Sequence, residues 1–207
     1  SPNIRDTLIA LGRDGSGHYV YDEATIVERA RNLNGYLSKV VDKFYYAMKA
    51  NSNPRVLSLI SSAGFGMECV SIHEVRYVRK NLGKSVPILF SPNFCSIREY
   101  REAIQLGAQV IVDDIEIIKQ DPSVFEGKKI GFRVDPVEGE DADDSHGHHK
   151  HVRTSGAGQK FGLPLSEVSK AAKEAKEYGA IVVGLHSHVG SGVLKPTVWR
   201  DTALTLS

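Results

Sequence analysis

The chain has 207 residues, of which 41% are hydrophobic and 25% charged, and its formal net charge is +1. This balance is ordinary for a soluble globular protein with a full core, and it excludes a strongly basic nucleic-acid surface. No apolar run approaches the ~20 residues of a membrane span. We therefore expect neither nucleic acid nor a membrane as a partner.

Two further features point to the compartment. Cys69 and Cys95 follow no metal or redox spacing, so we expect reduced thiols, with Cys69 packed in a strand rather than nucleophilic. Residues 1–6 have neither the basic head nor the apolar core of a signal peptide. We therefore expect a cytoplasmic protein.

The N-terminal part of the chain predicts few elements. Residues 1–17 hold a short helical segment and a glycine-rich turn, and residues 18–21 are predicted to form a brief strand. Asp22 can cap a helix that extends to about Leu37, because apolar residues recur there at helical spacing.

From residue 43 each short apolar strand is followed by a polar turn and a helix. The predicted strands are 43–48, 66–70, 86–90, 109–113, 129–134 and 180–187, and the predicted helices are about 54–63, 71–82, 96–106, 114–120, 164–178 and 195–205. This alternation predicts a parallel sheet, either doubly wound or closed as a barrel. Six βα units are legible where a closed barrel needs eight, so we expect a piece of a longer protein.

Lys49 stands where the first of these strands ends. Residues 44–48 are apolar or aromatic, and residues 51–54 then break the strand and start a helix. The carboxyl end of a buried strand is where α/β folds place their chemistry. An ammonium group against apolar walls loses hydration, which frees the amine for a Schiff base with a carbonyl such as the aldehyde of pyridoxal phosphate (PLP). The alternative is a lysine that extends into water.

Two other strands carry a charge. Glu68 lies on strand 66–70, and a carboxylate inside a barrel needs a buried cation, for which Lys49 is the natural partner. An acid on a solvated strand face is the alternative. Arg133 interrupts the apolar strand 129–134, so it faces either an anion or a structural ion-pair partner.

The strongest signal follows strand 180–187. His186 and His188 are two residues apart, so both point to one face. The Gly190-Ser191-Gly192 run comes just before a helix, and such glycines let backbone N–H groups approach an anion while the serine adds a donor. We interpret this as a phosphate contact below a ring-stacking imidazole. Together with Lys49 it indicates a phosphate-bearing aldehyde cofactor.

A long loop covers residues 136–158, acidic first and then rich in histidine. Loops of this length inside a compact domain are usually functional or disordered. Imidazole suits zinc or nickel, but the spacing of the histidines matches no closed zinc motif, and we expect no resident metal. The histidines are His146, His148, His149 and His151.

These motifs and their order resemble the PLP-dependent decarboxylases with an alanine-racemase-like barrel, the family of diaminopimelate, ornithine and arginine decarboxylases. Residues 46–51 resemble the family's cofactor-lysine motif, and residues 64–71 its second strand motif, whose acid contacts that lysine. Residues 188–192 are similar to the motif whose histidine stacks on the PLP ring and whose serine meets the phosphate. The resemblance runs from about His18 to the C-terminus.

Within the family, the diaminopimelate branch fits best. Residues 151–156, followed by residues 160–162, look like that branch's His…Thr-Gly…Lys-Phe-Gly signature, with Ser155 as an extra residue. Residues 89–94 and 148–154 resemble the decarboxylase half of fused aspartate kinase–diaminopimelate decarboxylases. The resemblance therefore allows for a kinase domain upstream.

The resemblance implies an α/β fold, a (β/α)8 TIM-like barrel of the alanine-racemase type with about six βα units in this chain. Residues 1–42 would lead into the barrel, and residues 43–207 would form an incomplete PLP-binding barrel. The C-terminal β-domain, with which strand 18–21 would pair, would be absent from the chain. The second phosphate loop and the acid for the pyridine nitrogen would also lie beyond Ser207, so we expect this chain alone to be inactive.

The resemblance also implies a reaction, the decarboxylation of meso-diaminopimelate to lysine by a homodimer with shared active sites. Lys49 would anchor PLP, Glu68 would tune Lys49, and His188 would cover one face of the ring. Gly190 and Ser191 would hold the phosphate. The expected catalytic residues are Lys49, Glu68 and His188, and the expected cofactor-binding residues are Lys49, Glu68, His188, Gly190, Ser191 and Arg133.

Other functions remain open. The protein could decarboxylate ornithine, arginine or lysine, or be a racemase or PLP carrier, although the signature between residues 151 and 162 argues against the last two. A non-catalytic regulator on the same barrel is a further alternative, against which the retained Lys49 speaks. In the last alternative Lys49 forms a Schiff base directly with a sugar or keto acid, as in class I aldolases.

Overall fold

The computed structural model describes residues 4–135, 161–190 and 195–207. Its strands are β1 (Tyr45–Ala47), β2 (Gly66–Cys69), β3 (Ile88–Phe90), β4 (Gln109–Val112), β5 (Lys129–Asp135), β6 (Leu163–Pro164) and β7 (Ile181–His186). Its α-helices are α1 (Ile4–Leu11), α2 (Glu23–Leu37), α3 (Pro54–Ser62), α4 (Ile72–Leu82), α5 (Ile97–Gln105), α6 (Ile115–Gln120), α7 (Leu165–Glu177) and α8 (Pro196–Thr205). Short 3-10 turns are η1 (Gly12–Asp14), η2 (Met48–Ala50) and η3 (Pro122–Val124).

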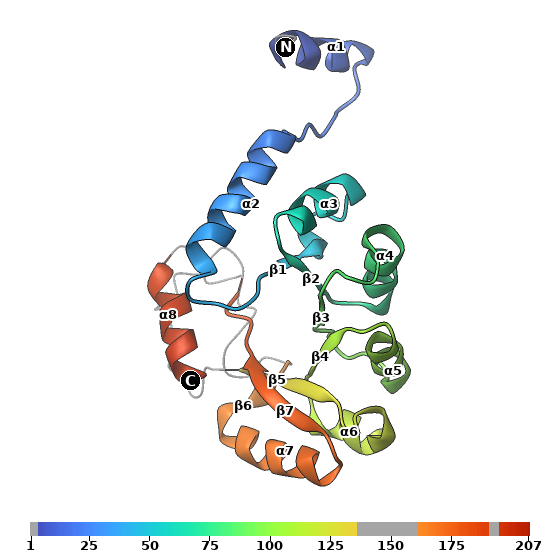
Figure 1. Cartoon of the computed structure of the whole chain (residues 1–207), viewed down its shortest axis with the longest axis vertical. Coiled ribbons are helices and arrows are strands. Elements are labelled where there is room, and N and C mark those ends of the chain that lie inside the picture. The colour runs from blue at the N-terminus through green and yellow to red at the C-terminus, as the bar shows by residue number, and fades with distance from the viewer. Residues whose placement is uncertain (1–3, 136–160, 191–194) are drawn as a thin grey trace.

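The strands form one curved parallel sheet. β1 to β5 pair in chain order, and β5 then pairs with β7 along residues 129–133 and with the two-residue β6 at Val134 and Asp135. In Figure 1 the strands follow an arc, and helices α3, α4, α5, α6 and α7 lie on its outer side. Among the described strands β1 pairs only with β2, and β7 only with β5, so the arc is open between β1 and β7. The architecture is therefore part of a (β/α) barrel.

Alternation along the strands separates two faces of the sheet. The residues that face the helices are apolar and almost fully buried, and register aligns them from strand to strand. They include Met67, Cys69, Ile88, Phe90, Val110, Val112, Ile130 and Phe132. Aromatic rings continue this core toward α5, where Tyr100 packs edge-on against Phe90 and Phe125 with ring centroids 5.8 and 5.6 Å apart. The opposite face of the sheet is left for other side chains.

Capping residues fix where the helices begin. The Asp22 carboxylate accepts a hydrogen bond from the backbone N–H of Thr25 at 2.7 Å, which confirms the predicted start of α2. Asn53 accepts from the N–H groups of Arg55 and Val56 ahead of α3, and Ser71 accepts from the N–H of Glu74 in α4. In each of these three helices a side chain therefore satisfies backbone N–H groups of the first turn.

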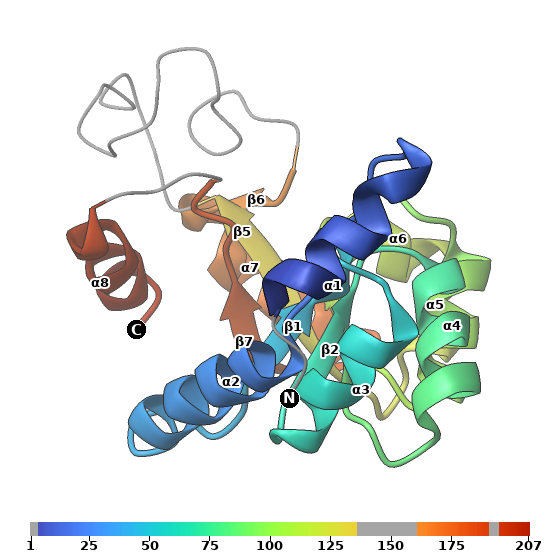
Figure 2. The same ribbon diagram turned by 90° about the horizontal axis from the view of Figure 1, so that it is seen from above.

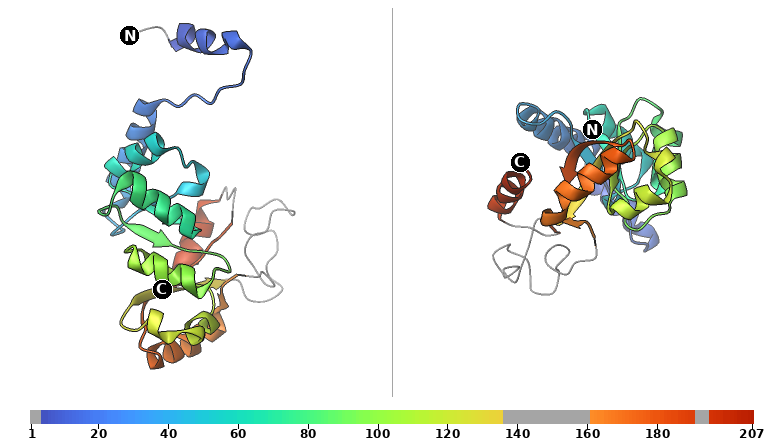
Figure 3. Two further views of the ribbon diagram at one scale, coloured as in Figure 1. Left: turned by 90° about the vertical axis from the view of Figure 1, so that its right-hand side faces the viewer. Right: turned by 90° about the horizontal axis from the view of Figure 1, so that it is seen from below.

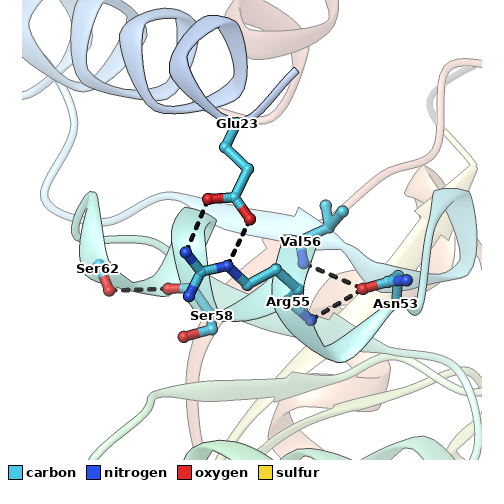
Figure 4. A network of polar contacts seen from close by, with 6 residues as sticks. All are labelled: Glu23, Asn53, Arg55, Val56, Ser58 and Ser62. Carbon is cyan, nitrogen blue, oxygen red and sulfur yellow. Dashed lines mark hydrogen bonds and ion pairs between the residues drawn. The ribbon is translucent and has the colours of Figure 1, made fainter. Parts of the chain in front are cut away.

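An ion pair joins α2 to α3 (Figure 4). Glu23 accepts two hydrogen bonds from the Arg55 guanidinium, at 2.6 and 2.7 Å. Asn34 adds a second link from α2, because its amide donates to the Ala63 carbonyl at 3.0 Å. These contacts hold α2 beside the helix that follows β1.

The N-terminal segment and α8 lie apart from the sheet. Figure 1 and the left view of Figure 3 show α1 far from the sheet at the end of an extended segment, and Figure 2 shows α8 set apart from α7. The predicted strand at residues 18–21 is wrong, because these residues form no ladder in the structure, and Tyr19 is 91% exposed. An extended segment becomes a strand only where another strand accepts its hydrogen bonds, and the described chain offers none to it.

The remaining predictions agree closely with the structure. All six strands and six helices predicted from residue 43 onward are present, with bounds that differ by at most two residues. The prediction missed β6, a strand too short to have any apolar pattern of its own. The loop at residues 136–158 lies outside the described residues.

Gly66 tests the packing of β1 against β2. A Cβ at this position would lie 2.6 Å from the Tyr45 ring and 2.8 Å from the Pro87 carbonyl oxygen. We expect Gly66→Ala to lower the free energy of unfolding by about 1–3 kcal/mol, because the backbone of Pro87 cannot move aside without disturbing the sheet. The measurement is urea unfolding followed by circular dichroism.

Gly35→Ala is the matched control. Gly35 lies within α2, and a Cβ there meets nothing within 4 Å, so helix propensity predicts a small gain in stability. Equal effects of the two substitutions would contradict the packing described for Gly66.

Candidate functional site

Polar side chains gather on the inner face of the sheet, where the strands end. Arg133 of β5 and His186 of β7 are direct partners in the parallel register. Asp113 comes immediately after the pair formed by Val112 of β4 and Phe132 of β5, so it stands at the level of Arg133. This is the carboxyl edge of the sheet, where barrels carry their active sites.

Arg133 is the most buried charge of this edge, with 8% of its surface exposed. Its Nη1 donates a hydrogen bond to the side-chain oxygen of Asn93, and its Nε lies 4.0 Å from Oδ1 of Asp113. The sequence left open an anion contact or a structural ion pair for this arginine. The structure supplies an acidic neighbour for it, and a role of Arg133 toward the cofactor stays a prediction.

An aromatic ring covers the same guanidinium. The Arg133 carbon Cζ lies 5.0 Å from the centroid of the Phe161 ring, and the Phe94 ring packs against Phe161 with the two centroids 5.1 Å apart. Gly162 makes this approach possible, because it has a positive φ of 85° and its Cβ would lie 3.2 Å from Cγ and from the carbonyl oxygen of Arg133. Phe161 and Gly162 of the Lys-Phe-Gly signature thus meet Arg133.

Glu68 has a partner other than the expected one. Its carboxylate accepts a hydrogen bond from the hydroxyl of Ser91, a residue that is 4% exposed. No ion pair joins Glu68 to Lys49 among the described residues, so the expected pair is absent from the structure. Register explains the difference, because Glu68 stands level with Ala47 and the chain leaves the strand before it reaches Lys49.

Lys49 lies in the turn η2, directly after β1, and is exposed. The predicted strand through Met48 is therefore too long by one residue, and Lys49 has no apolar walls in the described chain. Its neighbour Met48 is the buried residue of this turn, and its sulfur accepts from the Cys69 thiol at 3.6 Å. Lys49 is thus placed at the carboxyl end of β1, as predicted, and β1 is the strand at one open edge of the sheet.

His186 of β7 lies beside Arg133 of β5 in the parallel register. Burial, together with the positive charges of Arg133, His188 and Lys49, lowers the pKa of its imidazole to about 4. Its Nδ1 is buried and has no hydrogen-bond partner. The influence of Lys49 and Arg133 on one imidazole indicates that the ends of β1, β5 and β7 share an electrostatic environment on the inner face.

The segment after β7 holds the remaining predicted site residues. The strand ends at His186 rather than at residue 187, and His188 and Gly190 follow in an irregular segment. Gly190 adopts a φ of 107°, a conformation that favours glycine. Ser191 lies outside the described residues, so its expected contact with a phosphate stays a prediction.

Asp113 is the residue that the sequence analysis missed. Its two carboxylate oxygens are buried without a hydrogen bond of normal geometry, and burial raises the pKa of this carboxyl while Arg133 and the backbone of Phe94 oppose that rise. The available signal was the pair of acids, Asp113 and Asp114, at the end of the predicted strand 109–113. Ser91 and Asn93 belong to the motif of residues 89–94, but neither interrupts an apolar strand, so the sequence does not predict either as a site residue.

The remaining predictions concern cysteines, metals and membranes. Cys69 is fully buried, and burial raises the pKa of its thiol to about 12, which confirms a packing role. The histidines at 146–151 lie outside the described residues, and no cluster of metal-ligating side chains occurs within the described ranges. None of the helices in those ranges is both long and apolar enough to span a membrane.

The depressed pKa of His186 predicts a pH dependence of stability. Above about pH 6.5 the imidazole is neutral in the folded and in the unfolded chain. Below that pH the unfolded chain binds a proton at this imidazole, whereas the folded chain binds it only near pH 4. The free energy of unfolding should therefore fall as the pH falls from 6.5 to 4, by up to about 3 kcal/mol from this group. Urea unfolding at pH 7.5, 6 and 5 measures it.

The variant His186→Gln should show a shallower fall over the same range, because no imidazole is buried there. His73 is exposed on α4, so His73→Gln should keep the pH dependence of the parent protein. Identical profiles for the parent and His186→Gln would contradict the burial of this imidazole.

Comparisons with known proteins identify the family. Residues 23–205 match the model of the pyridoxal-dependent decarboxylases, pyridoxal binding domain. The chain is 33% identical over 196 residues to diaminopimelate decarboxylase of Methanothermobacter thermautotrophicus, which covers 93% of this chain and 44% of the relative. It is 34% identical over 191 residues to the Deinococcus radiodurans enzyme of that name, covering 89% and 46%.

A solved structure gives the same fold. The structure of diaminopimelate decarboxylase from Helicobacter pylori complexed with L-lysine superposes with a TM-score of 0.72 at 24% identity, covering 99% of this chain and 54% of that one. The chain thus spans less than half the length of the two curated relatives. The matched family model and the partial barrel agree, and the chain belongs to the pyridoxal-dependent decarboxylases, whose pyridoxal-binding domain it contains.

Proposed function

We propose that the protein containing this chain is a PLP-dependent decarboxylase that converts meso-diaminopimelate to lysine. The family model supports the reaction type, and the two curated relatives, both named diaminopimelate decarboxylase, support this substrate. The observation that carries the proposal is the carboxyl edge of the sheet, where Arg133 and His186 are register partners and where Arg133, His188 and Lys49 all contribute to the low pKa of His186.

The residues of this edge fit PLP chemically. Lys49 presents an exposed amine next to β1, and an aldehyde requires such an amine for covalent attachment. The positive groups around His186 favour an anion such as the phosphate of PLP. The buried Nδ1 of His186 lacks a partner, as expected where a ligand supplies polar atoms.

Each residue then has a defined task. Lys49 would hold the cofactor through its side-chain amine, and His188 would cover one face of the bound ring. Gly190 and Ser191 donate backbone and hydroxyl hydrogen bonds to the phosphate. Glu68 accepts a hydrogen bond from Ser91 and stands level with Ala47, so it would offer a carboxylate acceptor near the end of β1. When bound, PLP supplies the chemistry that accepts the electrons left by departing carbon dioxide.

We further propose that residues outside these 207 complete the site. The open edges of β1 and β7 support this, since an unpaired strand edge is normally covered in a working protein. The outside residues would supply the second phosphate loop, the acid for the pyridine nitrogen and the β-domain of a homodimer. A cytoplasmic location and an upstream kinase domain belong to the same proposal.

Lys49 provides the direct test. Borohydride reduction of the full-length protein with PLP, followed by peptide mapping, should place the phosphopyridoxyl group on Lys49. Lys49→Ala should abolish the adduct and lower kcat for meso-diaminopimelate by several orders of magnitude, because a covalent catalyst is lost. Lys43 is exposed two residues before β1, and Lys43→Ala should leave the adduct intact.

Two results would contradict the proposal. A phosphopyridoxyl group on another lysine, or on none, would refute the role of Lys49. Faster release of carbon dioxide from ornithine, arginine or lysine than from meso-diaminopimelate would refute the substrate.

His188→Ala should reduce PLP retention more than His186→Ala, because His188 lies beyond the carboxyl end of β7, where the cofactor would bind.

The chain of 207 residues alone should be catalytically silent. Its described part lacks strands that cover β1 and β7, and an open sheet does not hold a cofactor from all sides. Carbon dioxide release from meso-diaminopimelate with PLP is measured for residues 1–207 and for the full-length protein. Turnover by residues 1–207 at about 1 to 1,000 per second would show that no further segment is needed.

A further inference from the structure

The carboxylate of Asp113 is an unexplained polar group of the structure. Its side chain is 13% exposed, and neither oxygen makes a hydrogen bond of normal geometry. A buried acid in this state costs free energy unless a nearby positive charge compensates it. The compensating charge is Arg133, whose Nε lies 4.0 Å from Oδ1 of Asp113, too far for a hydrogen bond but within range of an ion pair.

Two other arginine–glutamate pairs among the described residues differ from this one. Glu102 accepts two hydrogen bonds of 2.6 Å from Arg76, and Glu23 accepts two from Arg55, as is typical of an arginine that serves only its carboxylate partner. Arg133 makes no such fork with Asp113. The pair is therefore oriented by charge, and among the described residues most N–H donors of the guanidinium have no acceptor.

Three other residues restrict where the guanidinium can lie. Asn93 accepts a hydrogen bond from Nη1, and the Phe161 ring lies 5.0 Å from Cζ. Gly162 packs so closely on Arg133 that a Cβ there would lie 3.2 Å from its Cγ. With Asp113 beside Nε, the guanidinium is held by groups that follow β3 and β4 and by the segment before β6.

We propose that Asp113 and Asn93 are positioning residues for Arg133, and that they hold its free N–H donors ready for an anionic group of the cofactor. Arginine carries five N–H donors, and within the described ranges Arg133 donates only to Asn93. The inference rests on the proposed function, because PLP is the ligand whose anionic group Arg133 would meet. Asp113 itself is not a catalytic residue in this proposal.

The experiment is a double-mutant cycle on PLP affinity in the full-length protein. The dissociation constant of PLP is measured by absorbance titration for the parent, Asp113→Asn, Arg133→Gln and the double variant. We expect Asp113→Asn to weaken binding about 5- to 50-fold in the parent and less than about twofold when Arg133 is already glutamine. A residue that only stabilises the fold would act equally in both backgrounds.

Two further variants provide a second test of the positioning role and a charge control. Asn93 is exposed, so Asn93→Ala should fold even if Asp113→Asn does not, and it should weaken PLP binding only when Arg133 is present. Glu177 is exposed on α7, and Glu177→Gln removes the same charge without effect on PLP binding. Thermal unfolding of each apoprotein reports whether it is folded.

The outcomes separate the two proposals. If the parent protein forms no borohydride-stable adduct on Lys49, the proposed function fails, and the inference that rests on it is overturned as well. If the adduct forms but Asp113→Asn and Asn93→Ala leave PLP affinity unchanged, or weaken it equally in both backgrounds, only the positioning role is overturned. If both substitutions weaken PLP binding only when Arg133 is present, the positioning role is supported.

Discussion

The parallel pairing of short strands is the constraint on which the rest of this structure depends. Because side chains alternate along a strand and the register is kept from β2 to β5, one face of the sheet is apolar throughout. The helices bury that face, and the opposite face needs no apolar residues for stability. Charged and polar side chains such as Glu68 and Arg133 can therefore lie on the inner face, against which none of the helices α3 to α7 packs.

Arg133 connects the local contacts of this inner face. Its guanidinium meets Asn93 after β3, Asp113 after β4 and the ring of Phe161, so one side chain links segments from separate parts of the chain. Its charge also contributes to the low pKa of His186 on the neighbouring strand. A neutral imidazole beside a fixed cation is a stable arrangement near neutral pH, since a second positive charge would be repelled.

The Lys-Phe-Gly signature gains a physical explanation from these contacts. Phe161 provides the face on which the guanidinium of Arg133 stacks, and Gly162 allows the chain to pass within van der Waals distance of the same side chain. Phe94 supports the ring from outside and itself has a positive φ of 50°, which is uncommon for an aromatic residue. The loop after β3 and the segment before β6 are thereby joined at the edge of the site.

The sequence by itself determined the succession of the main strands and helices from residue 43, the cap of α2 at Asp22 and the edge at which Lys49, Arg133 and the two histidines lie. These properties follow from local apolar patterns and from the rule that parallel strands end on one side. The tertiary structure alone decided which polar groups meet, because partners such as Arg133 and Asp113 are brought together by register between strands rather than by spacing in the chain. For the same reason the expected pair of Lys49 and Glu68 does not form. Glu68 stands level with Ala47, the last residue of β1, and accepts a hydrogen bond from Ser91, whereas Lys49 lies in the turn η2 beyond the strand.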